Sequence, residues 1–479
     1  MQLSGHQPFL LRKEPETMHV IIIGAGTGGL ALAHGLKRAG ISCAVFERDR
    51  TRGDGLQGYR VGIDPDGSRA LSRLLPPELF ATFAATCART GDRFTMFTEK
   101  YKEVLSLTGF AQPGADGAGA ERSVSRMTLR QVLLTGLEER VHFGKVFTRY
   151  DKNPDGTVTA HFEDGTSATG EVLVAADGSH SRVRRQYLPH APLKDSGLIG
   201  ITGKVPLTDA TRELLTPEVI DGVNMFLAPG GYSLIIHVMQ FPWDEQGRPR
   251  EGIGASDTEL LRAWPGLQFD NTRDYIMLGF GGAARNLPPD ILRMNGEQLH
   301  DLTVELTRNW DARLRKLAEL ADPSTCFPLN IRTSAPVEQW PTSNITLVGD
   351  AIHTMTPGRG VGANTALRDA ELLCAKLVSV RDREASLIPA IHDYETQMVR
   401  YGFEAVERSL AQMRGSDPVH KPVIGRAVLA GMRTGMRVVN HLPPLKRRMA
   451  AAAQRYRGHD HDAQQRPRQR RRRPDGPAH

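Results

Sequence analysis

The sequence predicts an α/β protein: a Rossmann-like dinucleotide-binding domain that carries an inserted, mainly antiparallel β-sheet and is followed by C-terminal helices. Three observations lead to this prediction. A short apolar run near the N-terminus passes directly into a glycine cluster and a helix-like stretch. Two later apolar runs end in Asp-Gly and Gly-Asp dipeptides. Segments between these runs alternate in polarity and are rich in turn residues, which is typical of antiparallel strands.

Length and composition limit the class of protein. A chain of 479 residues, 40% of them hydrophobic, can bury a large core, and we expect two or three domains. No run of about 18 apolar residues occurs, so no transmembrane segment is expected. Residues 1–17 lack the pattern of a secretion signal and are expected to be disordered. The four cysteines lie far apart, which indicates reduced thiols in a cytoplasmic protein and no metal site.

The positive charge is concentrated at the C-terminal end. The net charge is +7, yet residues 431–458 alone carry seven basic side chains and no acidic one. Residues 459–479 add six arginines against three aspartates. Because these two segments together carry +10, residues 1–430 are left with −3. The body of the protein is therefore not expected to bind nucleic acid.

The first motif lies in "HVIIIGAGTGGLALAHGLKRAGISCAVFER", residues 19–48. A β-branched strand is followed by Gly24, Gly26 and Gly29 in the pattern G-x-G-x-x-G. These glycines permit a tight turn, close approach of a pyrophosphate and close packing of helix on strand. The helix that follows presents its free N–H groups to a phosphate, and Glu47 at the end of the next strand can accept hydrogen bonds from a ribose diol. The unit predicts an adenine dinucleotide without distinguishing NAD, NADP and FAD. The candidate contacts are Gly24, Ala25, Gly26, Gly29, Glu47 and Arg48.

Two later segments also place a strand before a turn. In "GEVLVAADGSHSRVRRQ" an apolar strand runs into Asp177-Gly178 and a basic helix, which alone fits an ordinary strand-turn-helix. In "NITLVGDAIHTMTPGRGVGANTALRDAELL" the pair Gly349-Asp350 ends a strand, where ligands bind in open α/β sheets. The glycines of the next loop allow its backbone to approach a flat ring. The helix that starts near Ala363-Asn364 presents free N–H groups to that ring and can stabilise negative charge there.

The three segments, in this order, resemble the single-component (group A) FAD-dependent monooxygenases of the p-hydroxybenzoate hydroxylase type, over about residues 18–400. The family's D-G-x-x-S-x-V-R motif is matched by Asp177, Gly178, Ser181, Val183 and Arg184. A fourth segment, "SVSRMTLRQVLL", is similar to the family's R-x-x-L-x-x-x-L helix and implies that Arg126 reaches the flavin, with Arg130 as the alternative. The further FAD contacts that the resemblance implies are Arg126, Asp177, Arg184, Gly349, Asp350, Pro357, Gly360, Gly362, Ala363 and Asn364.

The resemblance also implies a domain organisation. The FAD-binding domain is expected to be discontinuous, and the inserted sheet is expected to roof a substrate pocket over the flavin. The expected parts are 1–17 as a disordered extension, 18–91, 120–194 and 290–400 as the FAD-binding domain, 92–119 and 195–289 as the substrate domain, 401–458 as C-terminal helices, and 459–479 as a disordered basic tail.

The chemistry that the resemblance implies is oxygen transfer. NADPH or NADH, bound transiently, would reduce the bound FAD. The reduced flavin would react with O2 to form a C4a-hydroperoxyflavin, which hydroxylates or epoxidises a bulky apolar or aromatic small molecule, as in secondary metabolism. No second G-x-G-x-x-G with strand and helix flanks occurs, so no separate NAD(P)H domain is expected. We expect a monomer or a homodimer.

Substrate-facing residues are less well defined by the sequence. Tyr232 and His237 lie in the expected roof sheet, and either could assist deprotonation of a phenol, with plain packing as the alternative. His353, beside the Gly-Asp pair, is expected to make a structural hydrogen bond. Arg60 and Tyr59 are candidates for lining the pocket or the nucleotide entrance.

Other functions fit parts of the sequence. A flavin-scaffolded cyclase or isomerase without net redox turnover would need the same cofactor site. A binder of nucleic acid or lipid would use the Arg-rich tail, which lacks interleaved aromatic residues. A flavin halogenase is disfavoured because the four tryptophans do not form a W-x-W-x-I-P stretch. The basic segment "VIGRAVLAGMRTGMRVVNHL" could touch a membrane surface, but core packing of a C-terminal helix is the preferred interpretation.

Overall fold

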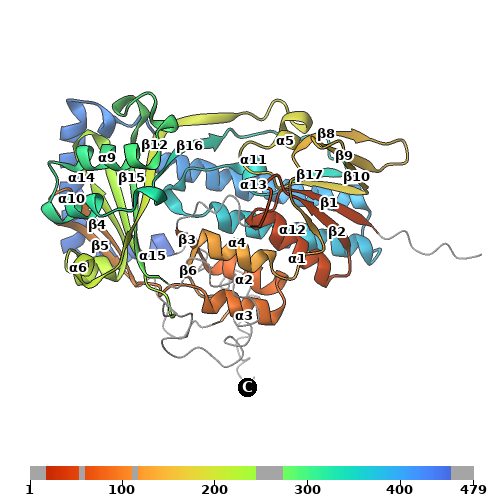
Figure 1. Ribbon diagram of the computed structural model, residues 1–479, viewed down its shortest axis with the longest axis horizontal. Coiled ribbons are helices and arrows are strands. Elements are labelled where there is room, and N and C mark those ends of the chain that lie inside the picture. Colours follow the sequence, from red (N-terminus) through yellow and green to blue (C-terminus); the bar gives the residue numbers. More distant parts are fainter. Residues whose placement is uncertain (1–17, 53–59, 110–116, 244–272, 455–479) are drawn as a thin grey trace, which may run out of the picture.

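The computed structural model describes residues 18–52, 60–109, 117–243 and 273–454. Two sheet-based layers lie beside each other along the long axis of the molecule (Figure 1). Long helices connect them, and the expected disordered segments 1–17 and 459–479 lie outside the described residues.

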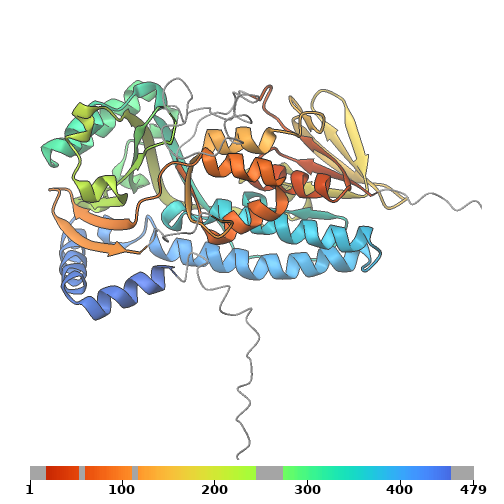
Figure 2. The ribbon, with the colours of Figure 1, turned by 90° about the horizontal axis from the view of Figure 1, so that it is seen from below.

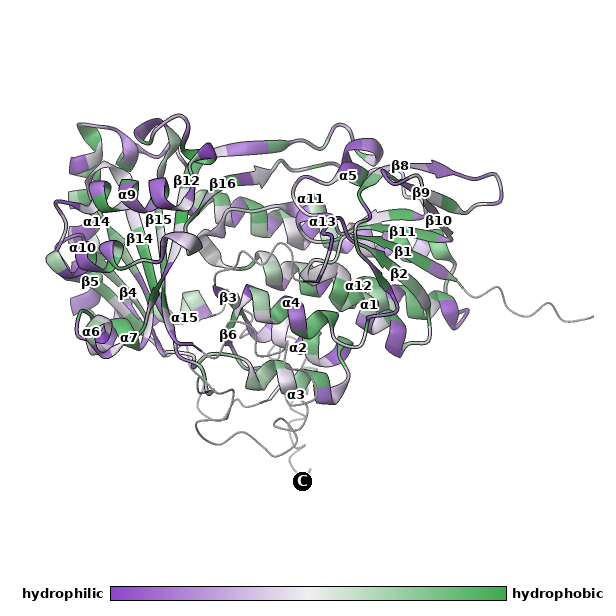
Figure 3. Ribbon diagram, in the orientation of Figure 1, coloured by the Kyte–Doolittle hydropathy of each residue, from purple (hydrophilic) through white to green (hydrophobic). Residues whose placement is uncertain are grey.

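The first layer is a five-stranded parallel sheet in the order β17-β11-β1-β2-β7. Its strands are β1 His19–Ile23, β2 Ser42–Phe46, β7 Val141–His142, β11 Val172–Ala175 and β17 Ile345–Leu347. The buried positions of the central strands β11, β1 and β2 are apolar, as expected of a parallel sheet covered on both faces (Figure 3). This arrangement confirms the Rossmann-like prediction.

Helices cover one face of the five-stranded sheet and a small meander covers the other. The helices are α1 Thr27–Arg38, α12 Gly362–Arg381 and α13 Leu387–Gln412. α1 packs against α12, and α12 packs against α13. The meander consists of β8 Phe147–Lys152, β9 Val158–Phe162 and β10 Ser167–Gly170. Its Phe162 ring stacks on Phe46 of β2 with centroids 4.7 Å apart, which closes that face against water.

The second layer is a seven-stranded sheet in the order β16-β12-β15-β14-β13-β4-β5. The strands are β4 Arg93–Thr98, β5 Glu103–Thr108, β12 Leu193–Pro206, β13 Gly222–Leu227, β14 Ser233–Met239, β15 Tyr275–Ala283 and β16 Phe327–Ser334. All neighbours are antiparallel except β13 and β4. The predicted mainly antiparallel sheet is therefore confirmed.

One face of the seven-stranded sheet buries a core of its own. Helices α9 Gly296–Thr307 and α10 Ala312–Glu319 contribute Leu299, Leu314 and Leu317 to it. These helices and β16 fall in the range 290–400 that the sequence assigned to the FAD-binding domain. We therefore propose that the last FAD-binding segment starts after β16, near residue 335, and ends with α13, near residue 412, rather than at residue 400.

The remaining elements link or flank the two layers. α14 and α15 (dark blue) lie beneath strands β4 and β5 (orange) in Figure 2. The α-helices and strands are β3 Arg60–Ile63, α2 Pro65–Leu74, α3 Pro77–Ala85, β6 Arg122–Ser125, α4 Arg126–Leu134, α5 Arg182–Tyr187, α6 Asp209–Arg212, α7 Pro217–Ile220, α11 Asp350–His353, α14 Ile424–His441 and α15 Pro443–Gln454. The short 3-10 helices are η1 Pro229–Gly231, η3 Ala284–Asn286, η4 Ile291–Arg293, η5 Pro323–Thr325, η6 Pro357–Arg359 and η7 Pro418–His420. Within the described ranges, no helix combines the length and the apolar character needed to cross a bilayer.

Candidate cofactor-binding site

The three motif glycines of the first loop stand in different surroundings. An added Cβ at Gly24, whose φ is +107°, would lie 2.4 Å from the Ala176 carbonyl oxygen, and one at Gly29 would lie 2.3 Å from the Gly24 oxygen. The left-handed turn and the close approach of the backbone after β11 require Gly24, and close packing of α1 on β1 requires Gly29. At Gly26 the nearest atom to an added Cβ is the Ala176 oxygen, at 3.8 Å. Protein packing does not explain this glycine, and open space before the start of α1 fits a phosphate that approaches the backbone.

Glu47 holds this loop in place. Its buried carboxylate accepts hydrogen bonds from the Ala25 N–H at 2.6 Å and from the Asp49 N–H at 3.0 Å. The Arg130 guanidinium lies 3.9 Å from Glu47 and 2.8 Å from Asp49. A carboxylate offers about four lone-pair positions, so Glu47 can still accept a ribose hydroxyl. Arg130 is thus placed at the end of β2.

The second motif forms a cross-link within the protein. Asp177 Oδ2 accepts the Arg182 N–H at 2.8 Å, and the other oxygen of Asp177 is buried without a hydrogen-bond partner among the described residues. Arg184 is buried and donates to the Ala351 oxygen at 2.7 Å and the Ser179 oxygen at 2.8 Å. Arg184 therefore ties the start of α5 to α11, the helix of the Gly-Asp motif.

Arg48 and His180 lie on the rim of the same region. Arg48, which directly follows Glu47, is exposed. Desolvation lowers the pKa of His180, and the positive charges of Arg332, Arg185, Arg48 and Arg184 lower it further. The turn after β11 therefore carries a concentration of positive charge, which favours an anionic ligand.

Asp350 lies where charges from distant segments meet. It is reached by solvent, but protein atoms surround it closely, and this desolvation is the main reason why its pKa is raised. Electrostatic interactions with His353, Arg126 and Arg184 lower the pKa of the same carboxylate. The structure thus brings Arg126 of α4 and Arg184 of α5 into electrostatic range of Asp350 in the Gly-Asp motif.

The glycine loop after Asp350 is fixed by Asn364. The buried Asn364 amide donates to the Gly62 oxygen at 3.0 Å and the Gly360 oxygen at 3.3 Å, and its oxygen accepts the Asp64 N–H at 3.1 Å. Gly360 has φ +64° and no atom within 4 Å of an added Cβ, and for Gly362 the nearest is 3.7 Å away. Asn364 therefore holds the loop, while the glycines leave its surface open. Pro357 is exposed in this loop, and Ala363 is half-buried at the start of α12.

A buried network that the sequence did not reveal lies behind Asp350. Asp369 of α12 accepts the Gly349 N–H at 2.7 Å and the Tyr401 hydroxyl at 2.6 Å, and it lies 2.6 Å from His353 Nε2. Burial lowers the pKa of His353, but the carboxylates of Asp369 and Asp350 outweigh burial and raise it. The structural hydrogen bond expected for His353 is present. Asp369 was missed because a lone aspartate within a helix pattern carries no motif.

The predicted roof residues lie on opposite faces of the seven-stranded sheet. His237 is buried, with Nδ1 3.1 Å from the Gly222 oxygen, and it shares a cross-strand row with Met277 and Lys204. Lys204 Nζ lies 4.0 Å from Met127 Sδ of α4, so this row faces the FAD-binding side.

Tyr232 does not lie on that face. Its ring packs in the core of the seven-stranded sheet, 5.5 Å from the Phe280 ring, and its hydroxyl donates to the Asn286 oxygen at 2.8 Å. Tyr232 is therefore not placed to contact a substrate on the face of His237. Arg60 donates to Ser123 Oγ at 3.1 Å, and Tyr59 lies outside the described residues.

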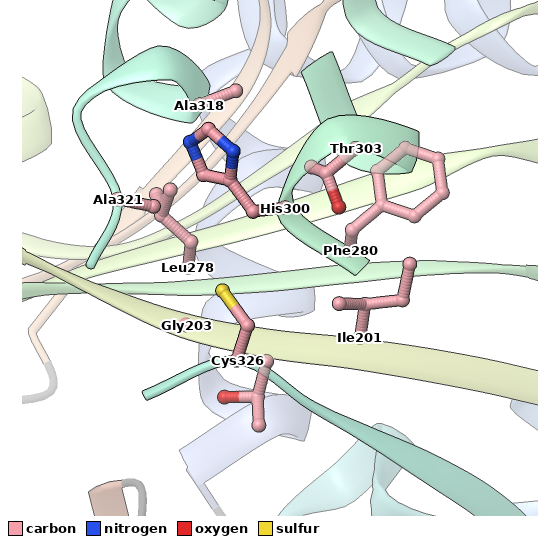
Figure 4. Close-up of a pocket in the computed structure, with 10 residues that line it drawn as sticks. Ile201, Gly203, Leu278, Phe280, His300, Thr303, Ala318, Ala321 and Cys326 are labelled. Atoms are coloured by element: carbon pink, nitrogen blue, oxygen red, sulfur yellow. The ribbon is translucent and has the colours of Figure 1, made fainter. Parts of the chain in front are cut away.

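A small cavity lies in the same core, between the seven-stranded sheet and helices α9 and α10 (Figure 4). Its walls include Leu278, Phe280, His300 and Cys326, and its volume is about 10 Å³. This space suffices for about one water molecule. It is too small for an organic substrate and lies on the face opposite Lys204 and His237.

Comparisons with known proteins agree with this geometry. Residues 17–60 and 308–409 match the FAD binding domain family. The dual O-methyltransferase/FAD-dependent monooxygenase CTB3 of Cercospora beticola is 32% identical over 389 residues, which cover 79% of this chain and 44% of that protein. The chain thus spans less than half the length of the dual O-methyltransferase/FAD-dependent monooxygenases that it matches. The FAD-dependent urate hydroxylase of Klebsiella pneumoniae is 28% identical over 79% of this chain and 85% of its own length.

Solved structures show the same fold. A Photorhabdus luminescens protein assigned as an FAD containing monooxygenase is 34% identical, with a TM-score of 0.70 over 82% of this chain and 97% of that chain. Klebsiella pneumoniae HpxO complexed with FAD and uric acid is 23% identical, with a TM-score of 0.66 over 90% and 96% of the two chains.

Proposed function

Because this chain belongs to the FAD-dependent monooxygenase family, we propose that it binds FAD and uses NADH or NADPH and O2 to oxygenate an apolar or aromatic small molecule. The observation that carries this proposal is the contrast among the loop glycines. Gly24 and Gly29 are required by packing, whereas Gly26 borders open space at the start of α1. A glycine that the fold does not need is expected where a ligand approaches the backbone.

We assign the cofactor contacts to two groups of residues. The loop of Gly24, Ala25 and Gly26, with the start of α1, would hold the pyrophosphate, and Glu47 would accept the ribose hydroxyls. Toward the seven-stranded sheet, Asp350 and the loop from Pro357 to Asn364 would hold the flavin half. The contacts proposed in addition are Gly29, Arg48, Arg126, Asp177, Arg184, Gly349, Gly360, Gly362 and Ala363.

The tasks of the protein follow from its own groups. Bound FAD, once reduced by NAD(P)H, supplies the activation of O2. The free N–H groups and dipole at the start of α12 would stabilise negative charge on the reduced ring. Arg126, Arg184 and His353 act on the Asp350 carboxylate electrostatically and favour its charged form, against the larger effect of desolvation, which raises its pKa. Asp369 in turn fixes the Gly349 backbone.

We propose the substrate wall on the face of the seven-stranded sheet that looks toward α4. Val223, His237, Met277 and Lys204 form one cross-strand row there. Lys204 Nζ lies 4.6 Å from the centre of the Tyr275 ring and close to Met127. A row of one valine, one histidine and one methionine with an ammonium at one end suits an aromatic substrate that carries a phenolate or carboxylate.

The test is NAD(P)H oxidation by the purified protein with a panel of neutral and anionic aromatic compounds, followed by mass spectrometry. The expected product has gained one oxygen atom. The Lys204→Ala substitution should raise KM for anionic substrates at least fivefold, while Lys152→Ala on β8 should leave KM unchanged. Product formation without NAD(P)H and O2 would instead support a flavin-scaffolded cyclase or isomerase.

A further inference from the structure

The C-terminal helices expose an unusual share of apolar side chains. Ten large hydrophobic side chains are exposed within the described residues, and seven of them lie between residues 423 and 449. They are Val423, Ile424, Met432, Val438, Leu442, Leu445 and Met449, and Val423 is 83% exposed. We refer to these seven, with the exposed Arg426, Arg437, Arg447 and Arg448, as the C-terminal face. Exposed apolar clusters of this kind mark interaction sites.

α14 is attached to the body along one side only. Leu429 is buried, Arg433 pairs with Glu99, and Asn440 accepts the Ser106 N–H at 3.1 Å and donates to Glu103 at 2.9 Å. These contacts fix the orientation of the helix against β4 and β5, so its opposite side is held outward. The expectation that this segment packs within the core is therefore wrong for most of its apolar residues.

The same segment is free of acidic residues. Residues 418–459 contain nine lysines and arginines and no aspartate or glutamate. The interspersed basic and large aliphatic side chains match the pattern of helices that lie in the interface of an anionic bilayer. Basic side chains near such a surface gain electrostatic attraction, and aliphatic side chains between them gain burial at the acyl boundary.

We propose that the C-terminal face docks the protein on an anionic lipid bilayer. Leu445 and Met449 lie four residues apart on one face of α15, and Leu442 is exposed at the junction of α14 and α15. These three side chains would enter the acyl boundary. Arg447 and Arg448 flank them and would contact lipid phosphates. A second copy fits less well, because a twofold dimer through this face would oppose two basic surfaces that carry no acidic partner.

The experiment is co-sedimentation of the full chain with vesicles of phosphatidylcholine alone or with 30% phosphatidylserine. We expect binding only to the vesicles that contain phosphatidylserine, and a loss of most of this binding in 0.5 M salt. The triple substitution Leu442→Ser, Leu445→Ser and Met449→Ser should lower partitioning at least tenfold. The double substitution Arg447→Glu and Arg448→Glu should also lower partitioning at least tenfold.

The matched control changes three exposed hydrophobic residues elsewhere, Leu292→Ser, Leu320→Ser and Ile388→Ser, and should bind like the unmodified protein. Melting temperatures of all variants establish that they are folded, and Leu445→Ser alone replaces the triple variant if that one unfolds. Absence of binding to phosphatidylserine vesicles would overturn the proposal. An equal loss of vesicle binding in the control variant would also overturn it. Concentration-dependent dimers that the face substitutions abolish, without vesicle binding, would assign the face to a second copy.

Discussion

At the scale of single residues, some motif positions make contacts that stabilise the fold, whereas others leave room for a ligand. Gly24, Gly29 and Asn364 make contacts that the fold itself needs. An added Cβ would meet no atom within 4 Å at Gly360 and only the Ala176 oxygen, at 3.8 Å, at Gly26, so both positions have room for a side chain. Each sequence motif contains residues that the fold needs and residues that leave room for a ligand, and only the structure distinguishes the two groups. The second kind is where substitutions should affect ligand binding without affecting folding.

Gly26→Ala should weaken FAD binding at least tenfold and leave the unfolding temperature of the apoprotein unchanged. The backbone at Gly26 has φ −84° and ψ −178°, which alanine adopts without strain, and the methyl group would point into the space proposed for the pyrophosphate. Gly29→Ala is the matched control, since its methyl would meet the Gly24 oxygen. It should destabilise the fold by about 1–3 kcal/mol. Flavin fluorescence titration and thermal melts measure both, and unchanged FAD affinity of Gly26→Ala would count against the cofactor position.

Glu395 should make stability depend on pH. Its buried carboxyl accepts hydrogen bonds from Thr342 at 2.7 Å and Thr346 at 3.0 Å, but desolvation dominates and raises its pKa from 4.5 to about 7. Between these two pH values the folded state holds a proton that the unfolded state has released. The contribution of Glu395 to the free energy of unfolding therefore falls as pH rises from about 4.5 to about 7.

The Glu395→Gln variant removes this titration. It should be more stable than the unmodified protein at pH 8 by about 1–3 kcal/mol, with a smaller difference at pH 5. Urea unfolding at the two pH values measures the difference. A gain of the same size at both would show that the carboxyl does not titrate in this range.

At the scale of elements, α11 is positioned by helices that follow it in the chain. Asp369 on α12 joins the Gly349 backbone, His353 and the Tyr401 hydroxyl of α13, so three elements share one carboxylate. The sequence predicted strand, turn and helix here from the apolar run and the glycines. It did not predict this link, because its members lie up to 52 residues apart and none belongs to a motif.

Asp369→Asn should destabilise the protein by about 2–4 kcal/mol, because an amide cannot accept all three hydrogen bonds and leaves His353 without its buried counter-charge. FAD affinity should fall as well, since the Gly349 turn loses its anchor. Tyr401→Phe removes one hydrogen bond and should cost only about 1 kcal/mol. Urea unfolding and FAD titration compare the two, and equal small effects would mean that the network does not position α11.

Other elements show why a local pattern does not determine its partner. Helices α9 and α10 fall in the range 290–400 that was expected to belong to the FAD-binding domain, but the apolar face of a helix does not specify which of two sheets it covers. Tyr232 and His237 were both placed on the substrate face, but they lie five residues apart, and strand alternation puts such residues on opposite faces. Tyr232 has an extended backbone and shares the face of Leu234 and Ile236, which lies in the sheet's own core.

At the scale of the whole molecule, the cofactor motifs were predictable because each needs a particular backbone geometry that few residues provide. Glycines at tight turns, β-branched runs in a covered parallel sheet and an acidic residue at the end of β2 can be identified without a structure. The strand order and the Asp369 network depend on contacts between distant segments. No local pattern encodes them.

Deletion of residues 459–479 should leave kcat and KM unchanged, because the assigned cofactor and substrate residues all precede this segment. Steady-state NAD(P)H oxidation of the full-length and truncated proteins measures this. The deletion removes six arginines, so binding to anionic vesicles should weaken while turnover does not. A parallel loss of turnover would indicate that the tail takes part in catalysis.

The most direct test of the account is calorimetric titration of the apoprotein with FAD, for the unmodified chain and for Gly26→Ala and Asp350→Asn. We expect one FAD per chain, and at least tenfold weaker binding in each variant, since one extended ligand should contact both positions. Failure of the unmodified chain to bind FAD, or full affinity in either variant, would contradict it.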